Sequence, residues 1–278
     1  MTKRFPAFGL AAALVVVPAA AASDADYDAL VAAERAFAAM SPKAGVAAAF
    51  RHYIAPDAIM FRPRPIRAAE HYAKPAPPDT VLLDWAPEHA EIAASGDLGW
   101  TVGPALIRPI AEPERRGGTH FFSIWQRNAA GDFRNVLDVG VDHEALPLST
   151  TVERHAERAD APALAPSAQA VRLQALVSAD RALAANLAGA DAASAFAAAA
   201  VDDVLVLRNG AAPHRGDAAR AKVATQPALD LASLRISAAG DLGATAGWGG
   251  DPDKPHLYQR AWRWVDGDWR VVVDLVIP

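Results

Sequence analysis

The sequence of 278 residues contains no cysteine. Without cysteine the chain can form no disulfide bond, no thiolate nucleophile and no cysteine-ligated zinc or iron–sulfur site. It also has no residue that could carry the lipid of a lipoprotein anchor. Because disulfides are optional in oxidising compartments, their absence is compatible with export.

Positive charge is sparse and scattered. Lys and Arg number 27 against 32 Asp and Glu, and the formal net charge is -5. Basic residues cluster only in short pairs such as Arg115–Arg116. This distribution excludes the basic surface of a nucleic-acid-binding protein, so we expect no nucleic-acid partner. The hydrophobic fraction of 52% and the charged fraction of 21% are those of a folded globular protein.

The common catalytic motifs are also missing. The sequence has no G-x-S-x-G, no H-E-x-x-H, no phosphate-binding glycine loop and no dinucleotide-binding glycine motif. The histidines do not recur at metal-ligand spacing, and we predict no metal site and no cofactor. They are His52, His71, His89, His120, His143, His155, His214 and His256.

The N-terminus is typical of a cleaved signal peptide at residues 1–22. Lys3 and Arg4 precede an apolar run, Phe5–Val17, and Ala20–Ala22 offers a small-residue cleavage site. The run is shorter than the roughly 20 residues that a bilayer-spanning helix needs. These features predict a periplasmic or secreted protein with no membrane contact after cleavage; an uncleaved anchor is the alternative.

Three stretches occur twice, in the same order and about 140 residues apart, which indicates a duplicated domain rather than a short repeat. The pairs are LVAAERAFAA with LVSADRALAA, SGDLGWTVG with AGDLGATAG, and GDFRNVLDVGV with GDWRVVVDLVI. We predict a first domain at 24–146, a proline-containing linker at 147–167 and a second domain at 168–278.

Each copy begins with apolar residues at helical spacing and ends with long alternating runs bounded by Gly-Asp or Asp-Gly turns. Helices first and antiparallel strands afterwards predict an α+β fold. The turn Asp266–Gly267 should join the last two strands, with Trp264 opposite Trp269.

This order of elements, with ERAFA, APDAIMFRP and GDFRNVLDVG in one copy and SADRALA, VDDVLVLRNG and GDWRVVVD in the other, resembles the nuclear transport factor 2-like superfamily and its SnoaL-like domains of unknown function. The resemblance implies two tandem cone-shaped domains. Each would be a strongly curved, mostly antiparallel sheet wrapped on N-terminal helices around a pocket. Members of the superfamily include isomerases, cyclases, dehydratases, epoxide hydrolases and binding modules, so fold alone does not choose a function.

The last strand of each copy decides which residues face the expected pocket. Strict alternation from Trp269 places Val273 and Leu275 inside and Asp274 outside, and in the first copy it likewise places Asp138 outside. Both aspartates then have a structural or interface role, beside Arg134 and Arg270. A single β-bulge would reverse this assignment, because one extra residue exchanges the faces.

The same alternation gives the candidate pocket residues. In the first copy they are His52, Tyr53, Arg62, Trp85, Ser123, Trp125 and Asn135; in the second they are Arg208, Tyr258 and Arg260. The aromatic residues suit core packing as well as ligand binding. A buried Arg260 would need an anionic partner, and Arg62 and Arg208 could also be solvated strand ends. Catalytic residues are not identified.

Two functions remain open. Asn135 and Ser123 are not acids or bases near neutral pH, which favours an exported module without catalysis that binds a small apolar or weakly polar ligand or has a structural role. The alternative is an isomerase, cyclase or dehydratase. An inward carboxylate or histidine within hydrogen-bond reach of another polar group would favour the enzyme.

The outer faces of the two expected sheets mix apolar and charged residues. Because the linker holds the second domain at a high local concentration, we expect the two domains to pair within one chain and the protein to be a monomer.

We expect the mature protein to begin near Ser23, because the small-residue site ends at Ala22. N-terminal sequencing of the protein from its native host checks this. A chain that begins at Met1 and stays in the cytoplasm would contradict export.

Overall fold

The computed structural model describes residues 24–62, 64–75, 78–112, 114–156, 161–227, 229–251 and 253–278. The predicted signal peptide, 1–22, lies outside these residues. None of the helices in these ranges combines the length and the apolar composition that crossing a membrane requires.

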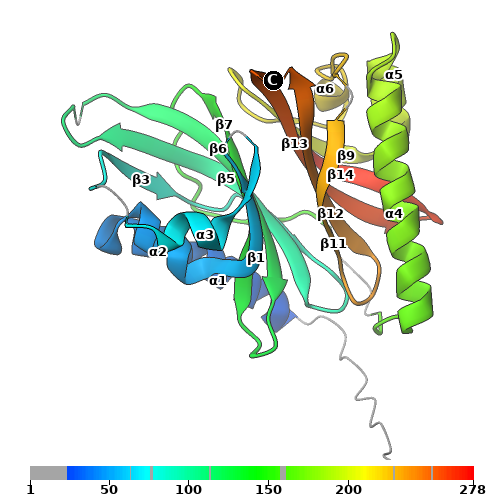
Figure 1. Ribbon diagram of the computed structural model, residues 1–278, viewed down its shortest axis with the longest axis horizontal. Helices are drawn as coiled ribbons and strands as arrows, with labels where there is room; N and C mark the ends of the chain where they lie inside the picture. Colours follow the sequence, from blue (N-terminus) through cyan, green and yellow to red (C-terminus); the bar gives the residue numbers. More distant parts are fainter. Residues whose placement is uncertain are drawn as a thin grey trace, which may run out of the picture.

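Two units follow one another along the chain, each with its own sheet (Figure 1). The first unit starts with a helix whose buried residues recur at helical spacing, among them Leu30, Glu34 and Phe37. Its elements are α1 (Asp24–Ala44), α2 (Val46–Tyr53), β1 (Ile54–Phe61), β2 (Pro65–Arg67), α3 (Ala68–Ala73), β3 (Val81–Trp85), β4 (His89–Ile92), β5 (Leu98–Pro109), β6 (Gly117–Arg127), β7 (Phe133–His143) and β8 (Glu153–Arg154).

The second unit repeats this order with fewer strands. Pro166 starts its long helix at a position where the missing backbone N–H costs nothing. Its elements are α4 (Pro166–Leu187), α5 (Ala192–Ala199), β9 (Ala200–Arg208), β10 (His214–Arg215), α6 (Gly216–Arg220), β11 (Leu229–Ile236), β12 (Leu242–Asp251), β13 (Lys254–Val265) and β14 (Asp268–Ile277).

The strand orders of the two sheets correspond. The first is β2-β1-β7-β6-β5-β4-β8, with β3 also paired to β5, and the second is β10-β9-β14-β13-β12-β11. In each sheet the first long strand lies parallel to the last one, while the long hairpin strands are antiparallel. The predicted α+β class is confirmed. β8 falls in the predicted linker yet pairs with β4, so this part of the connection belongs to the first sheet.

The last strand of the first unit contains one residue more than its neighbour. Leu137 pairs with Ile124, and Asn135 pairs with Trp125. Val136 lies between them without a partner, which is a β-bulge.

The second unit has the same bulge at the same place. Next to the turn the register is as predicted, with Trp264 opposite Trp269. Val271 pairs with Trp262, but Val273 pairs with Ala261, so Val272 has no partner.

The bulges overturn the prediction that Asp138 and Asp274 lie on the outer faces. Beyond each bulge the alternation is reversed, so Asp138 faces the helix side of its sheet opposite Ser123, and Asp274 does so opposite Arg260. Leu137 lies instead in the core between the sheets. The arginines predicted beside the aspartates pair elsewhere: Arg134 lies 3.3 Å from Asp132, and Arg270 lies 3.7 Å from Asp268.

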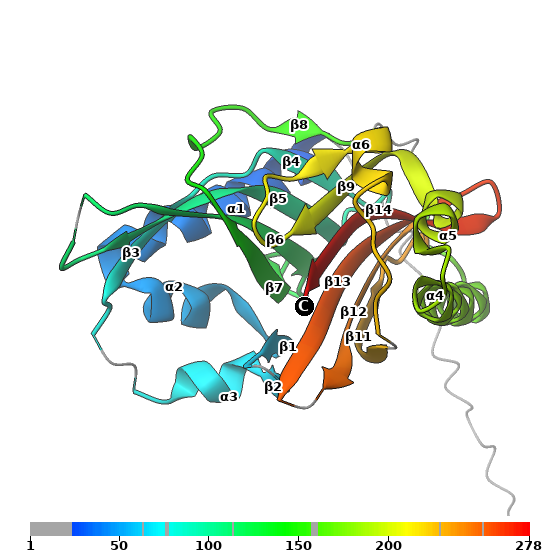
Figure 2. The ribbon, with the colours of Figure 1, turned by 90° about the horizontal axis from the view of Figure 1, so that it is seen from above.

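The two sheets lie side by side between outer helices, with α1 to α3 on one side and α4 and α5 on the other (Figure 2). One hydrophobic core contains residues of both sheets and buries the faces that turn away from the helices. It includes Val102, Phe122, Ile124, Leu137 and Val141 of the first unit and Leu242, Ala244, Ala261, Val273 and Leu275 of the second.

Two equivalent turns exchange hydrogen bonds between the units. Asp97 accepts a bond from the backbone N–H of Ala238 at 3.0 Å, and Asp241 accepts one from the backbone N–H of Ala94 at 2.9 Å. Each aspartate sits in the same Gly-Asp-Leu-Gly stretch of its unit. The exchange is reciprocal, as expected of a pair related by a twofold rotation.

Replacing either turn aspartate should weaken the contact between the units. Asp97→Ala and Asp241→Ala each leave a backbone N–H of the other unit without its acceptor, so the free energy of unfolding should fall by about 1–2 kcal/mol. Urea denaturation measures this, with the exposed Asp132→Ala as control. A loss no larger than that of the control would contradict the role of these bonds.

We propose that this pairing occurs within one chain and that the protein is a monomer. Light scattering of the protein should therefore give the mass of a single chain. A stable mass of two chains would contradict it.

Candidate functional site

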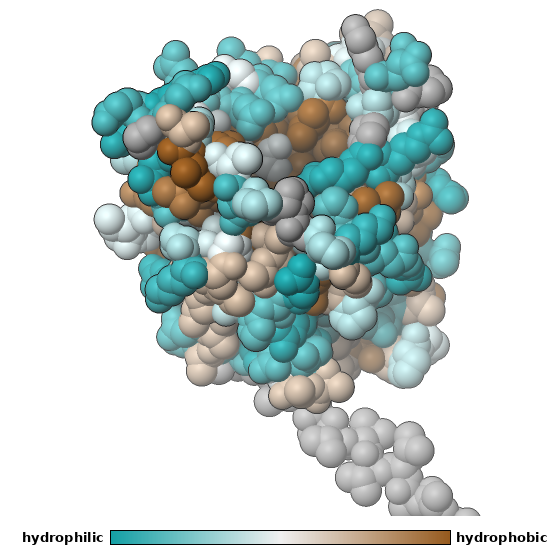
Figure 3. All heavy atoms as spheres, turned by 60° about the vertical axis from the view of Figure 1, so that its left-hand side comes forward, coloured by the Kyte–Doolittle hydropathy of each residue, from teal (hydrophilic) through white to brown (hydrophobic). Residues whose placement is uncertain are grey.

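A cavity of about 280 Å³ opens in the first unit where β1 and β7 meet α3. Most of its lining residues are apolar, and the polar side chains are those of Arg62, Tyr72, Asn135 and Asp138. The other lining residues are Phe50, Ile54, Ala58, Ile59, Met60, Phe61, Ala68, Val139, Gly140, Leu257 and Ile277. On the face that Figure 3 shows, hydrophobic side chains lie at the surface in patches among hydrophilic ones.

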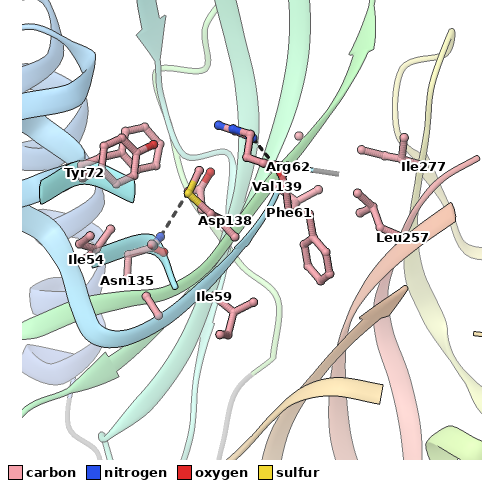
Figure 4. Close-up of a pocket in the computed structure, with 15 residues that line it drawn as sticks. Ile54, Ile59, Phe61, Arg62, Tyr72, Asn135, Asp138, Val139, Leu257 and Ile277 are labelled. Carbon is pink, nitrogen blue, oxygen red and sulfur yellow. Dashed lines mark hydrogen bonds between the residues drawn. The ribbon is translucent and has the colours of Figure 1, made fainter. Parts of the chain in front are cut away.

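Two strands of the second unit help to close this cavity. Leu257 of β13 and Ile277 of β14 face the first unit's Phe61 and Val139 across it, while Tyr72, Asn135 and Asp138 gather on the far side (Figure 4). The site is therefore polar at the end that lies in the first unit and apolar at the seam between the units.

Asp138 is the carboxylate of this cavity, and the bulge at Val136 turns it inward. Ser123 Oγ donates a hydrogen bond of 2.7 Å to Asp138 Oδ2, and Asn135 Nδ2 donates a longer one of 3.2 Å to the same oxygen. Because both donors bond the same carboxylate oxygen, they hold the carboxylate in place. Its other oxygen, Oδ1, can then accept hydrogen bonds from further partners.

Burial sets the acidity of the polar groups in the cavity. It raises the pKa of Asp138 to about 6, against the opposing effects of the hydrogen bonds from Ser123 and Asn135 and the charge of Arg62. Burial also raises the pKa of Tyr72 to about 12, so its phenol stays protonated at neutral pH. Asp138 is thus the cavity-lining group whose protonation changes near neutral pH.

A second carboxyl, Glu34 of α1, is fully buried beneath this site. It accepts hydrogen bonds from Trp85 at 2.7 Å, Thr101 at 2.6 Å and Trp125 at 2.9 Å. Burial raises the pKa of Glu34 to about 7 in spite of these donors, and the charge of Asp138 adds to the rise. No arginine or lysine pairs with Glu34 among the ion pairs of the described residues.

The second unit has carboxylates at the two corresponding positions, but they are paired with arginines. Asp180 replaces Glu34, and Asp274 replaces Asp138. Arg260 bonds both, through Nε to Asp274 at 2.7 Å and through Nη1 to Asp180 at 3.2 Å. Arg208 also pairs with Asp274. Burial alone would raise the pKa of Asp274, but the two guanidinium groups outweigh it and hold this pKa below its ordinary value.

The predicted pocket residues of the first unit fall into three groups. Arg62 and Asn135 line the cavity, and Ser123 lies beneath it in contact with Asp138. Trp85 and Trp125 are buried and bond Glu34 instead of facing the cavity.

The third group lies away from this cavity. His52 and Tyr53 line a more open hollow between α1 and the β6–β7 hairpin. Tyr53 packs its ring on Phe37, with ring centres 5.2 Å apart, and His52 is exposed.

The three predicted pocket residues of the second unit form one bonded cluster. Tyr258 donates to Asp180 at 2.6 Å, and Arg260 and Arg208 pair with Asp274. The anionic partners that a buried Arg260 requires are therefore Asp180 and Asp274.

Sequence reasoning missed Asp138, Glu34 and Tyr72. A bulge has no local sequence signal in these strands, so Asp138 could not be assigned. Glu34 could have been found, because it lies one helical turn from Leu30 and so on the buried face of its helix.

Histidines of β4, β6 and β7 lie close to one another in the first sheet. His120 Nδ1 lies 2.6 Å from His143 Nε2, and His120 Nε2 lies 3.6 Å from Glu88. Burial lowers the pKa of His120 to about 3, with further lowering by His143 and His89. Within the described ranges, no three or more His, Asp or Glu side chains are arranged to hold a metal ion.

No family model matches this sequence, and no curated protein matches it. Solved structures similar to one unit include a nuclear transport factor 2-like protein of unknown function from Pseudomonas putida, 19% identical over 39% of this chain and 87% of that chain, with a TM-score of 0.33. A candidate scytalone dehydratase from Novosphingobium aromaticivorans is 14% identical over 40% of this chain and 87% of that chain, with a TM-score of 0.33. A candidate dehydratase of the same family from Streptomyces avermitilis is 14% identical over 40% of this chain and 97% of that chain, with a TM-score of 0.32. The structures from Pseudomonas putida and Streptomyces avermitilis are nuclear transport factor 2-like proteins, the family that the sequence motifs resemble.

The raised pKa of Asp138 predicts a pH-dependent stability. Because the folded-state pKa of about 6 lies above the ordinary value of 3.8, the stabilising effect of the protonated form is complete below about pH 4 and is lost as the pH rises through 6. Relative to Asp138→Asn, the free energy of unfolding of the unaltered protein should therefore fall by roughly 2 kcal/mol between pH 4 and pH 8. Urea denaturation at both pH values measures this difference. Parallel curves for the two proteins would show that the pKa is not raised.

Proposed function

We propose that the first unit binds a small molecule in its cavity and that Asp138 transfers a proton to or from it. The observation that carries this proposal is a carboxyl that lines a mostly apolar cavity, has two hydrogen-bond donors and has a pKa of about 6. A carboxylate within reach of a second inward polar group is the feature that separates catalysis from simple binding.

A pKa near 6 suits general acid–base catalysis at neutral pH. The ionised form predominates and can accept a proton, while the protonated form is close enough in energy to return it. Ser123 and Asn135 hold the carboxylate in place, since both donate to its Oδ2. Isomerisation, cyclisation and dehydration all require such removal and return of a proton, and a dehydration or isomerisation next to a carbonyl group is the reaction we favour.

The remaining walls supply binding. Phe61, Leu257 and Ile277 offer apolar area to the body of the ligand, and burial of that area favours association. In this proposal the first sheet curves around the ligand as one cone, the second unit closes its open side, and the protein works after export.

Binding without chemistry is the second candidate. The observation that favours it is the predominance of apolar lining, with Ile54, Ile59 and Met60 beside the aromatic residues. The high pKa of Tyr72 also keeps its phenol from acting as a base at neutral pH.

Proton transfer can be tested by exchange of substrate hydrogen with solvent. In D2O, the protein should introduce deuterium next to the carbonyl group of at least one compound in a panel of small ketones and β-hydroxy carbonyl compounds. Asp138→Asn should lower this rate by about 100-fold or more, because the proton acceptor is lost. Proton NMR follows the exchange.

Asp132→Asn is the matched control, since Asp132 is an exposed aspartate just before the same strand. Its rate should equal that of the unaltered protein. Pocket binding of a panel compound without Asp138-dependent exchange would favour the second candidate.

A further inference from the structure

The two units differ by one positive charge around their buried carboxylates. In the second unit Asp180 and Asp274 face two arginines, Arg208 and Arg260. In the first unit the corresponding carboxyls are Glu34 and Asp138, and among the described residues Arg62 is the one arginine that acts on Asp138. The second unit thus has two arginines for its two carboxylates, and the first unit lacks the second of these arginines.

The missing cation corresponds to a single residue. Arg260 lies opposite Asp274 on the adjacent strand, and Ser123 lies opposite Asp138 in the same way. The next residue across each sheet is a threonine, Thr245 opposite Arg260 and Thr101 opposite Ser123. Serine at position 123 thus takes the place of the buried guanidinium.

We propose that the cavity of the first unit accepts a ligand with a cationic nitrogen, such as a protonated amine, an amidine or a guanidine, which pairs with Asp138 as Arg260 pairs with Asp274. This inference rests on the binding part of the proposed function, because it assigns a charge class to the ligand of the same cavity. Pairing with a cation lowers the pKa of a carboxyl, as at Asp274, so a ligand of this class is bound by Asp138 without proton transfer. In this proposal the guanidinium of Arg260 takes, in the second unit, the position that the ligand's cationic group takes in the first.

The free oxygen of Asp138 is the acceptor for this group. Ser123 and Asn135 both donate to Oδ2, and Oδ1 accepts no hydrogen bond from the described residues. In the second unit both oxygens of Asp274 are bonded, Oδ1 by Arg260 and Oδ2 by Arg208. A charged donor to Asp138 would complete its hydrogen bonding in the same way.

Arg62 does not prevent a second cation from binding. It corresponds to Arg208, which ends the same strand in the second unit and shares Asp274 with Arg260. One buried carboxylate between two guanidinium groups is therefore a stable arrangement in this fold. Arg62 instead donates to the carbonyl of Phe61 at 3.0 Å.

Binding of a cation should be linked to pH. The groups around Asp138 are Arg62 at the end of β1, Tyr72 on α3, Glu34 on α1, Ser123 on β6 and Asn135 on β7. Since the ionised Asp138 is the partner, affinity should rise up to about tenfold per pH unit below pH 6 and level off above pH 7. Binding should then release protons.

Three probes of similar shape and different charge test the inference on the full chain. They are butylguanidinium, the neutral butylurea and the anionic valerate, titrated at pH 8 by calorimetry and by NMR of the backbone amides of Asn135, Asp138 and Gly140. Butylguanidinium should bind about tenfold more tightly than butylurea, because a charged donor bonds a carboxylate more strongly than a neutral one. Asp138→Asn should abolish this preference, and the control Asp132→Asn should retain it.

Exchanging the residues at the equivalent positions provides a second test. Ser123→Arg should fill the cavity's polar end from within and prevent butylguanidinium binding. Arg260→Ser should lower the thermal stability of the protein, and butylguanidinium should restore part of the loss by replacing the removed guanidinium. Absence of rescue together with unaltered binding by Ser123→Arg would overturn the equivalence of the two sites.

The outcomes separate this inference from the proposed function. If butylurea or valerate shifts the cavity amides and binds as tightly as butylguanidinium, the charge class is wrong while the cavity is still a binding site. If none of the three probes shifts these amides, both the charge class and the proposed binding function are contradicted.

Discussion

The insertion of one residue in the last strand of each unit is the constraint on which the rest of the molecule depends. Val136 and Val272 have no partner across the sheet, and beyond them the two faces of the strand are exchanged. This exchange directs Leu137 and Val273 to the core between the sheets and Asp138 and Asp274 to the helix side. A straight strand would bury charged groups between the two sheets, where each unpaired carboxylate costs several kcal/mol, so pairing of the units and formation of the cavity have one common cause.

The same framework then gives two different interiors. In the second unit Arg260 and Arg208 neutralise Asp274, and the polar cluster is complete without a ligand. In the first unit a serine replaces the larger arginine, and a cavity lies beside Asp138. The pKa of Asp138 is about 6, so this carboxyl gains and loses its proton near neutral pH. The second unit also contributes Leu257 and Ile277 to the wall of the first unit's cavity, so both units take part in the site.

Much of this fold could be predicted from periodicity and repeats. The α+β class, the turn at Asp266 and the register next to it follow from alternation and from the Asp-Gly pair, which are local signals. The site could be predicted only in part. Arg62, Asn135 and Ser123 were assigned to it, but Asp138 was placed on the wrong face, because a bulge depends on how a whole strand packs on its partner and leaves no mark in the residues beside it.

The connection between the units has a role besides joining them. β8 pairs in parallel with β4 through Glu153 and Arg154. It therefore covers backbone N–H and C=O groups of β4 that would otherwise lie unpaired at the edge of the first sheet. Uncovered strand edges are templates for pairing with other chains, and a short, charged covering strand opposes such association. The segment between the two units therefore covers a strand edge at which another chain could otherwise pair.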